Sequence, residues 1–220
     1  MGRPGGGMRR LTPLEARVLG VLIEKQHTVP DTYPLSLNAL LSGCNQKTAR
    51  DPVIEATDAE VLTAVDGLKG LSLVFEGSSS RVVKFEHNLG RVLHLPSQSV
   101  ALLAALMLRG PQTAAELRLN CERLHRFADI SSVEGFLDEL ATKEPPRVVK
   151  LARAPAAREA RWAHLLCGEV AAPVWQASAA ESDVSAGELA ALKAEQTRLA
   201  AELESLKALV QRMAQELGIR

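Results

Sequence analysis

Residues 57–86 read TDAEVLTAVDGLKGLSLVFEGSSSRVVKFE, and this stretch decides the fold. Thr57 and Glu60 stand at capping-box spacing, in which each side chain accepts a hydrogen bond from the backbone N–H of the other residue. Apolar residues then recur at three- and four-residue steps, and Gly70 follows them as a helix stop. The pattern predicts a helix that ends near Lys69.

Two runs of β-favouring residues follow this helix, at 73–75 and 82–85. The residues between them, 76–81, carry turn chemistry and no apolar side chain, so the two runs predict a β-hairpin. A helix that leads directly into a β-ribbon is the arrangement of the third helix and the wing in a winged helix-turn-helix domain. Nucleic-acid binding is therefore the first hypothesis that the sequence raises.

The same pattern recurs about 72 residues further along the chain. Ser131 and Glu134 have capping-box spacing and open a second amphipathic helix. Residues 147–151 and 161–165 are the predicted strands of a second wing. The sequence therefore predicts a helix followed by a wing twice.

Further helices are predicted before each of these pairs. They cover residues 13–26, 36–41, 97–109 and 114–123, and Gly43 ends the second of them. The expected fold class is mainly α with small antiparallel β-wings. It consists of tandem winged helix-turn-helix units and a C-terminal coiled-coil helix.

The chain divides by composition into five segments. They are a disordered, glycine-rich tail (1–10), winged-helix domain 1 (11–95), winged-helix domain 2 (96–168), a linker rich in Ala, Pro and Ser (169–184), and a coiled-coil helix (185–220).

The composition is that of an ordinary globular protein, with 220 residues, 46% of them hydrophobic, and a net charge of zero. The longest apolar run, residues 100–108, is far shorter than the roughly 20 residues that span a bilayer, and no signal-peptide pattern precedes it. We expect a cytoplasmic protein that does not associate with membranes. Its three cysteines are widely spaced and indicate neither a disulfide framework nor a zinc site.

Several runs of the sequence resemble the YceH-like family of bacterial proteins, over about residues 12–168. The runs are LTPLEARVL at 11–19, YPLSLNAL at 33–40, CNQKTARDPV at 44–53, LRGPQTAAEL at 108–117 and HRFA at 125–128. The resemblance implies two winged-helix domains in tandem. It implies no activity, because that family has no established biochemical function that carries over.

No catalytic motif is present: the chain has no G-x-S-x-G, no P-loop, no glycine-rich dinucleotide turn and no H-E-x-x-H. We therefore expect neither an enzyme nor a cofactor. Cys121 and His125 have the i, i+4 spacing of metal ligands, but no second pair stands near them to complete a tetrahedral site. We interpret this pair as structural and expect no metal.

In a winged helix that reads DNA, the exposed face of the third helix carries hydrogen-bond donors for the bases. Here the outward positions of both third helices are mostly acidic or hydroxylic: Asp58, Glu60, Thr63 and Asp66 in the first, and Ser132, Glu134, Asp138 and Glu139 in the second. Carboxylates repel phosphates, so the sequence disfavours base reading by these helices.

The cations lie instead in the wings and in the loops before the third helices. These predicted nucleic-acid-binding residues are Lys47, Arg50, Arg81, Lys84, Arg118, Arg123, Arg126, Arg147, Lys150, Arg153, Arg158 and Arg161. One interpretation is phosphate or minor-groove contact by wings and loops. The other is a solvated surface of mixed charge. Asn45 is interpreted as a turn residue and Trp162 as a core residue.

The leading hypothesis is a DNA-associated regulatory protein that contacts double-stranded DNA mainly through wings and loops. The alternative is a protein–protein interaction scaffold that uses the acidic third helices and the C-terminal helix without binding DNA. DNA target, protein partner and ligand are left open.

A heptad repeat follows Ser185 without interruption and predicts a parallel homodimeric coiled coil. Its a positions are Leu189, Gln196, Leu203, Val210 and Leu217, and its d positions are Leu192, Leu199, Leu206 and Met213. Glu188 with Lys193, and Glu202 with Lys207, are spaced for attraction between parallel strands. The alternative is a single amphipathic helix that folds back on its own body.

Overall fold

A computed structural model describes residues 8–77, 82–153, 159–170 and 207. The chain divides into one unit at Met1–Val174 and a second at Trp175–Arg220. In the second unit only Lys207 is described, and it lies in a helix. The predicted coiled-coil residues from Leu189 to Leu217, and most of the predicted linker, lie outside the described residues.

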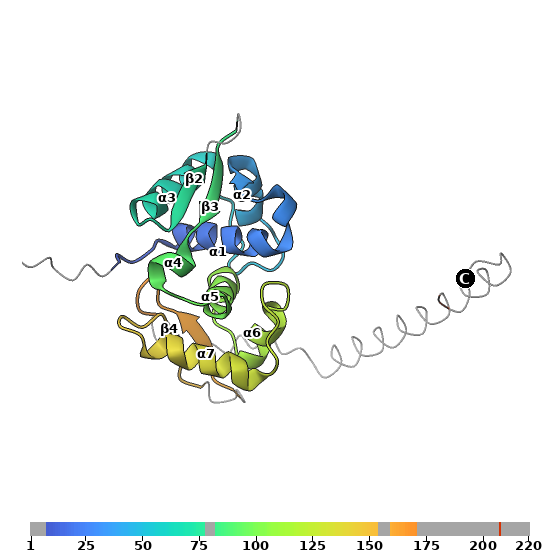
Figure 1. Ribbon diagram of the computed structural model, residues 1–220, viewed down its shortest axis with the longest axis vertical. Helices are drawn as coiled ribbons and strands as arrows, with labels where there is room; N and C mark the ends of the chain where they lie inside the picture. The colour runs from blue at the N-terminus through green and yellow to red at the C-terminus, as the bar shows by residue number, and fades with distance from the viewer. Residues whose placement is uncertain (1–7, 78–81, 154–158, 171–206, 208–220) are drawn as a thin grey trace, which may run out of the picture. The chain divides into compact units, whose positions relative to one another are not determined.

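The first half of the larger unit contains three helices and a small sheet (Figure 1). In chain order its elements are α1 (Pro13–Thr28), the 3₁₀ turn η1 (Pro30–Thr32), β1 (Leu35–Ser36), α2 (Leu37–Cys44), α3 (Asp58–Gly70), β2 (Val74–Gly77) and β3 (Lys84–His87). The strands form an antiparallel sheet in the order β1-β3-β2, in which Leu35 faces Phe85.

In its described residues the second half contains four helices and a two-stranded sheet. Its elements are α4 (Leu89–Leu93), α5 (Ser97–Arg109), α6 (Ala114–Asn120), α7 (Ile130–Thr142), β4 (Val148–Lys150) and β5 (Trp162–His164). β4 and β5 pair antiparallel, and Gln112, between α5 and α6, forms an isolated bridge to Trp162. The prediction of a mainly helical chain with small antiparallel sheets is confirmed.

Three of the predicted helix starts are confirmed by their caps. Thr12, Thr57 and Thr113 each accept the backbone N–H of the glutamate three residues later, and that glutamate bonds back to the cap backbone. The predicted start at Ser131 is wrong. Asp129 is the N-cap of α7, and its Oδ1 accepts bonds from the N–H and hydroxyl of Ser132, both at 2.7 Å.

The predicted end of α2 at Gly43 is also wrong, because Gly43 lies inside the helix. A Cβ at Gly43 would stand 2.5 Å from Cγ1 of Val21 on α1. This glycine is therefore required by close helix packing and does not end the helix. The short helix α4 was not predicted, because its five residues are too few to establish a periodicity.

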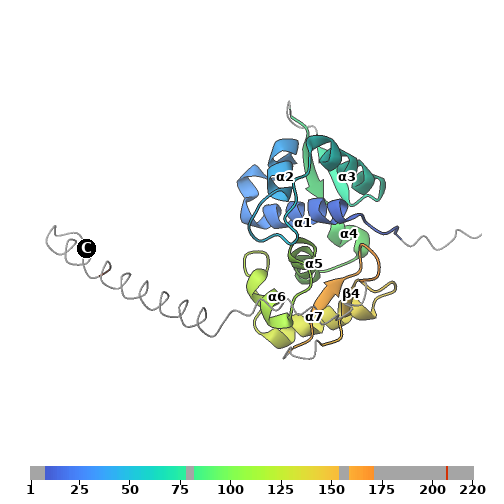
Figure 2. The same ribbon diagram turned by 180° about the vertical axis from the view of Figure 1, so that it is seen from behind.

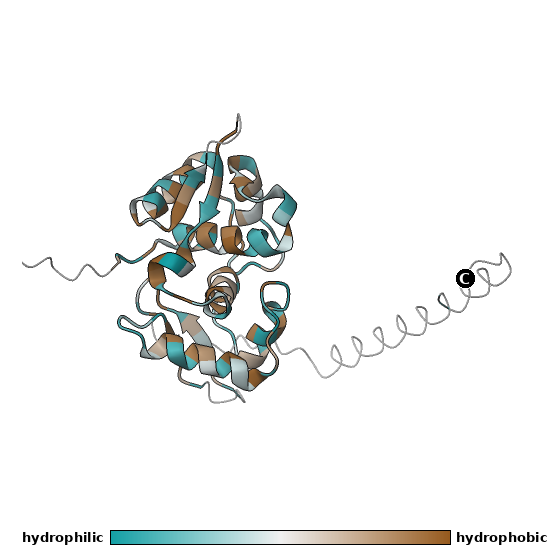
Figure 3. Ribbon diagram, in the orientation of Figure 1, coloured by the Kyte–Doolittle hydropathy of each residue, from teal (hydrophilic) through white to brown (hydrophobic). Residues whose placement is uncertain are grey.

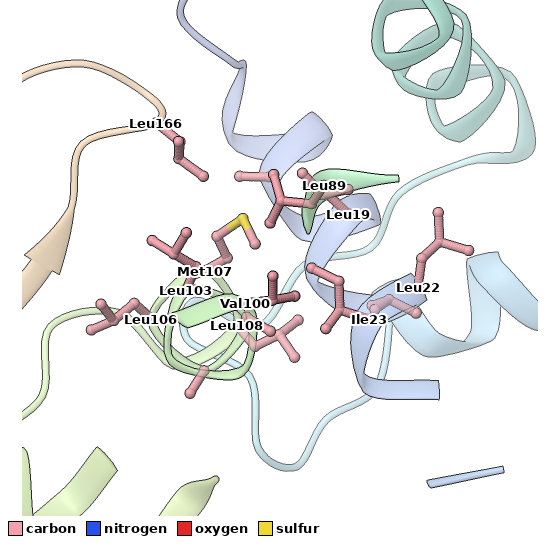
Figure 4. Close-up of a cluster of buried hydrophobic side chains, with 14 of the residues drawn as sticks. Leu19, Leu22, Ile23, Leu89, Val100, Leu103, Leu106, Met107, Leu108 and Leu166 are labelled. Carbon is pink, nitrogen blue, oxygen red and sulfur yellow. The ribbon is translucent and has the colours of Figure 1, made fainter. Parts of the chain in front are cut away.

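α1 and α5 lie at the middle of the unit, with the first sheet on one side and the second sheet on the other (Figure 1, Figure 2). Apolar residues are present on both helices (Figure 3). Leu19 and Ile23 from α1 and Leu103 from α5 belong to one buried cluster with α4 residue Leu89 (Figure 4). The hydrophobic core is therefore continuous across both halves.

A glycine of α1 packs closely against α5. A Cβ at Gly20 would stand 3.0 Å from Cδ2 of Leu108 and 3.4 Å from Cβ of Met107. Such contacts are tighter than ordinary van der Waals packing, so Gly20 permits this helix spacing. Within the described ranges, no helix is both long enough and apolar enough to cross a membrane.

Candidate nucleic-acid interface

The cation Arg50 occupies a different place from the one that the sequence suggested. Its side chain is fully buried, with Nη2 2.6 Å from Oε2 of Glu24 on α1 and Nε donating to the carbonyl of Gly43 at 3.1 Å. A phosphate cannot reach this guanidinium without breaking the ion pair. The structure thus corrects the expected exposure of Arg50 and assigns it a role in holding α1, α2 and the following loop together.

The charge state of Glu24 depends on this pairing. Burial acts to raise the pKa of Glu24, but the hydrogen bond and charge of Arg50, assisted by Lys25, outweigh burial, so the pKa lies below its ordinary value. Glu24 is therefore ionised at neutral pH and balances the buried Arg50.

Two arginines of the second half also have internal partners. Arg161 forms an ion pair with Glu116 at 3.0 Å and donates to the carbonyl of Pro111 at 2.8 Å. Arg118 is half-buried and donates to the carbonyl of Ala128 at 3.1 Å. Arg147 is half-buried, and burial lowers its pKa. The guanidiniums of Arg118 and Arg161 therefore have structural contacts in addition to any external role.

The remaining predicted cations differ in exposure. Lys84 in β3 is half-buried opposite Gly77, and Arg81 and Arg158 lie outside the described residues. The exposed members of the set are Lys47, Arg123, Arg126, Lys150 and Arg153. We refer to these five residues as the exposed cations.

The exposed cations come from separate segments. Arg123 and Arg126 lie between α6 and α7, directly before the Asp129 cap, and Lys47 lies in the loop after α2 (Figure 1). Lys150 ends β4, and its Nζ stands 5.2 Å from the ring centroid of Trp162, within cation–π range. Trp162 itself is only 2% exposed, which confirms its interpretation as a core residue.

The third helix of each half presents an acidic surface, as predicted. On α3, Asp58, Glu60, Thr63 and Asp66 are exposed, and on α7 Glu134, Asp138 and Glu139 are exposed while Ser132 is half-buried. Glu60 is used in its own helix cap, where Oε2 accepts the Thr57 N–H at 2.8 Å. α3 also exposes an apolar side chain, Leu62, at 40%.

The hairpin of β2 and β3, which the sequence predicts as the first wing, carries a balanced charge rather than a free cation. Lys69 at the end of α3 forms an ion pair with Glu76 of β2, and Asp66 lies 3.4 Å from the same ammonium group. The strands themselves add Lys84 and Glu86. The described part of this wing is therefore a weak electrostatic site for phosphate.

Asn45 has a structural role. Its amide donates to the carbonyl of Ala56 and its Oδ1 accepts the Ala56 N–H, both at 2.8 Å. This two-bond clamp fixes the loop between α2 and α3. In the part of the chain that is described, no group of three or more His, Cys, Asp or Glu residues is placed to hold a metal ion.

Sequence reasoning missed the buried charges around α1. Arg50 pairs with Glu24, and the charge of Arg50 also acts on Arg17, which is only 3% exposed. The burial of Arg17 could have been predicted from its position. It lies one turn before Val21, among apolar residues of a helix that has no wide polar face.

Residues 11–157 match a family described as "Protein of unknown function, DUF480". A UPF0502 protein of Burkholderia multivorans is 78% identical over 163 residues, which cover 74% of this chain and 69% of that protein. A UPF0502 protein of Leptothrix cholodnii is 69% identical over 189 residues, which cover 84% of this chain and 85% of that protein. Neither relative's name states an activity.

Proposed function

Since the chain belongs to the DUF480 family of proteins of unknown function, we propose a function from its own residues. We propose that it is a winged-helix protein of DNA-associated regulation, which contacts phosphates through loops and the second wing and does not read bases with its third helices. It is not proposed as an enzyme.

The order and pairing of the elements support a winged-helix interpretation of both halves. In the first half, β1 lies between α1 and α2 in the chain and pairs with β3, which gives the sheet order β1-β3-β2. In the second half, Gln112 lies between α5 and α6 and pairs with Trp162 of β5. The bridge at Gln112 occupies the place that β1 has in the first half, so α5, α6, α7, β4 and β5 follow the order of α1, α2, α3, β2 and β3.

The single observation that carries the DNA proposal is the separation of charge around α7. Arg123 and Arg126 are exposed on the segment that enters this helix, whereas the outward face of the helix carries Glu134, Asp138 and Glu139. With this arrangement, the two arginines attract the DNA phosphates to the segment before α7, and the carboxylates of α7 repel the phosphates from the helix itself. The affinity should then be modest, strongly salt-dependent and nearly independent of DNA sequence.

The proposal is tested by titrating the intact protein into fluorescent random-sequence duplex DNA at several salt concentrations. Each phosphate that the protein neutralises contributes about 0.9 to the slope of log affinity against log salt, so contact by four of the exposed cations gives a slope of about −4. A slope near zero, or no binding at low salt, contradicts the DNA proposal.

A second candidate is supported by α3. Leu62 is exposed between Asp58 and Asp66 on the outward face of this helix, an apolar residue with acidic neighbours. This combination suits a basic, partly apolar protein surface. In this adaptor function, charge reversal at Asp58 and Asp66 abolishes partner capture, whereas substitution of Arg123 and Arg126 has no effect.

We also propose that the chain is a parallel homodimer through residues 185–220. The support is the heptad repeat with Gln196 as its single polar core position. A dimer doubles the number of phosphate contacts and suits a symmetric DNA site.

A further inference from the structure

A pocket of about 540 Å³ lies where the two halves of the larger unit meet. Its walls come from the start of α1, the segment after Asp51, the end of α5, and β5 with the residues that follow it. Volumes of roughly 300–1,000 Å³ are typical of small-molecule sites. The pocket is thus large enough for a ligand and is separate from the exposed cations.

The interior of the pocket is apolar. Ala16 on α1, Leu106 and Met107 on α5, and Ala163 on β5 line it and are buried. Figure 4 shows Leu106 and Met107 as part of the buried cluster along α5. Burial of an aliphatic or aromatic group against this surface is favourable, at about 25 cal/mol for each Å² removed from water.

One buried cation, Arg17, stands in this apolar wall. Its Nη1 donates to the carbonyl of Cys44 at 3.1 Å and its Nη2 to the carbonyl of Pro52 at 2.6 Å. Its Nε has no hydrogen-bond partner, and among the described residues no carboxylate forms an ion pair with it. The guanidinium is bonded to two carbonyls; the charge of Asp51 favours its charged form, whereas burial and the like charge of Arg50 oppose it.

His164 is a second incompletely bonded group in the same wall. Its Nδ1 is buried and lacks a hydrogen-bond partner in the described structure. Burial lowers the pKa of His164 to about 4, so the ring is neutral at pH 7. Arg17 is therefore the only positive charge among the residues that line the pocket.

The mouth of the pocket is acidic. Four carboxylates line the pocket and belong to exposed residues: Asp51, Glu55, Glu60 and Glu169. These carboxylates repel a ligand with several negative charges, such as a phosphate, but one buried cation in the wall still favours a single negative charge with an apolar body.

We propose that this pocket binds a small amphipathic monocarboxylate, with its apolar body against α5 and β5 and its carboxylate toward Arg17. The ligand supplies a directly bonded ion-pair partner for Arg17, and its hydrocarbon part replaces water on the apolar wall. This proposal does not depend on whether the protein binds DNA.

Three probes of equal chain length test the charge preference: octanoate, octanol and octylammonium, each titrated into the intact protein by calorimetry at pH 7 and below its micellar concentration. Octanoate should bind at least ten times more tightly than octylammonium, with octanol between them. Tighter binding of octylammonium shows that the acidic mouth dominates and overturns the proposal, and so does the absence of octanoate binding.

Two variants locate the site. Arg17→Met replaces the guanidinium by a shorter, uncharged and unbranched side chain, and should weaken octanoate binding about tenfold while octanol binding changes little. Arg17 also bonds to the carbonyls of Cys44 and Pro52, so its loss can disturb the loop as well as the site. Ala56→Phe is therefore a second variant, in which the new ring fills the pocket from the half-buried position 56. Ala56→Phe should abolish binding of octanoate and octanol, and the control Ala39→Phe, on the exposed face of α2, should bind both normally. Unchanged octanoate binding in Ala56→Phe places the ligand elsewhere and refutes the assignment.

Discussion

Arg50 and Glu24 form a buried ion pair in which Nη2 lies 2.6 Å from Oε2. The pair connects α1 to the loop after α2, and the Gly43 carbonyl accepts a further bond from Nε of Arg50. The sequence suggested that Arg50 is an exposed cation in a loop. The structure shows that its guanidinium is fixed in the interior. Loss of either partner leaves the other buried without compensation.

Replacement of Glu24 by Gln should destabilise the protein by about 3 kcal/mol, because the buried guanidinium loses its counter-charge. Urea unfolding followed by circular dichroism measures the change. Glu76→Gln, which removes the exposed partner of Lys69, is the matched control and should leave the free energy of unfolding nearly unchanged. Equal effects of the two substitutions would show that burial does not set the strength of the Glu24 pair.

Gly20→Ala should destabilise the protein by about 1–3 kcal/mol, since the new methyl group stands 3.0 Å from Leu108. Leu108→Ala in the same chain should partly relieve the clash, so that the two effects are less than additive in a double-mutant cycle. Gly135→Ala is the control, because nothing lies within 4 Å of a Cβ there, and it should stabilise α7 by about 0.5–1 kcal/mol. Strict additivity of the first pair contradicts the packing argument.

Stability should fall as the pH decreases from 6.5 to 4. Burial lowers the pKa of His87 and of His164 to about 4, and the nearby charge of His27 contributes to the shift of His87. Between the unfolded and folded pKa values the unfolded chain binds more protons, so the free energy of unfolding rises with pH through this window and is lost in acid. Each histidine accounts for up to about 3 kcal/mol, at 1.36 kcal/mol for each unit of pKa.

Urea unfolding at pH 7 and pH 4.5 measures this dependence. The double variant His87→Asn, His164→Asn should show a much shallower change with pH than the parent chain, whereas His94→Asn, at an exposed position, serves as the control. The same steep change in parent and double variant would assign the acid sensitivity to other groups.

Substitution of Arg123 and Arg126 by Gln should reduce affinity for random duplex DNA and lower the magnitude of the salt slope by about 2, one for each lost phosphate contact. Arg91→Gln, at an exposed position on α4, is the matched control and should bind like the parent. If charge reversal at Asp58 and Asp66 changes affinity while the arginine variants do not, the contact surface is α3 and the loop assignment is wrong.

Sedimentation equilibrium should find the intact chain dimeric at micromolar concentration and a chain that ends at Glu181 monomeric. Gln196→Leu should stabilise the dimer but weaken its preference for two strands, because a polar a position sets the oligomeric state at a cost in stability. A monomeric intact chain rules out the coiled coil, and a dimeric truncated chain places the contact in the folded body.

The helix starts could be predicted because a capping box is a local pattern: Thr12, Thr57 and Thr113 each need only the glutamate three residues later. The N-cap Asp129 was missed because aspartate and serine are both good N-cap residues and both occur within three positions here. Only the backbone conformation decides which of them caps the helix. The acidic faces of α3 and α7 followed from helix periodicity, which also identified Val61 and Val133 as core residues.

The tertiary partners could not be predicted in this way. The burial of Arg50 depends on Glu24, which is 26 residues away, and the bridge from Gln112 to Trp162 spans a still longer separation. The pocket around Arg17 is formed by segments from both ends of the unit, and no local pattern records which segments meet.

If the two winged-helix halves that we propose arose by gene duplication, the contact of α1 with α5 at Gly20 limits what their ancestor was. A solitary ancestor of the first half would expose to water the part of α1 on which Leu108 and Met107 now pack. That ancestor must therefore have paired with a second copy of itself before the two genes fused, or have carried polar residues there that were lost afterwards. If the ancestor was a homodimer, the present chain is that dimer joined into one polypeptide. Cutting the chain between residues 95 and 96 should then yield two fragments that reassociate when mixed.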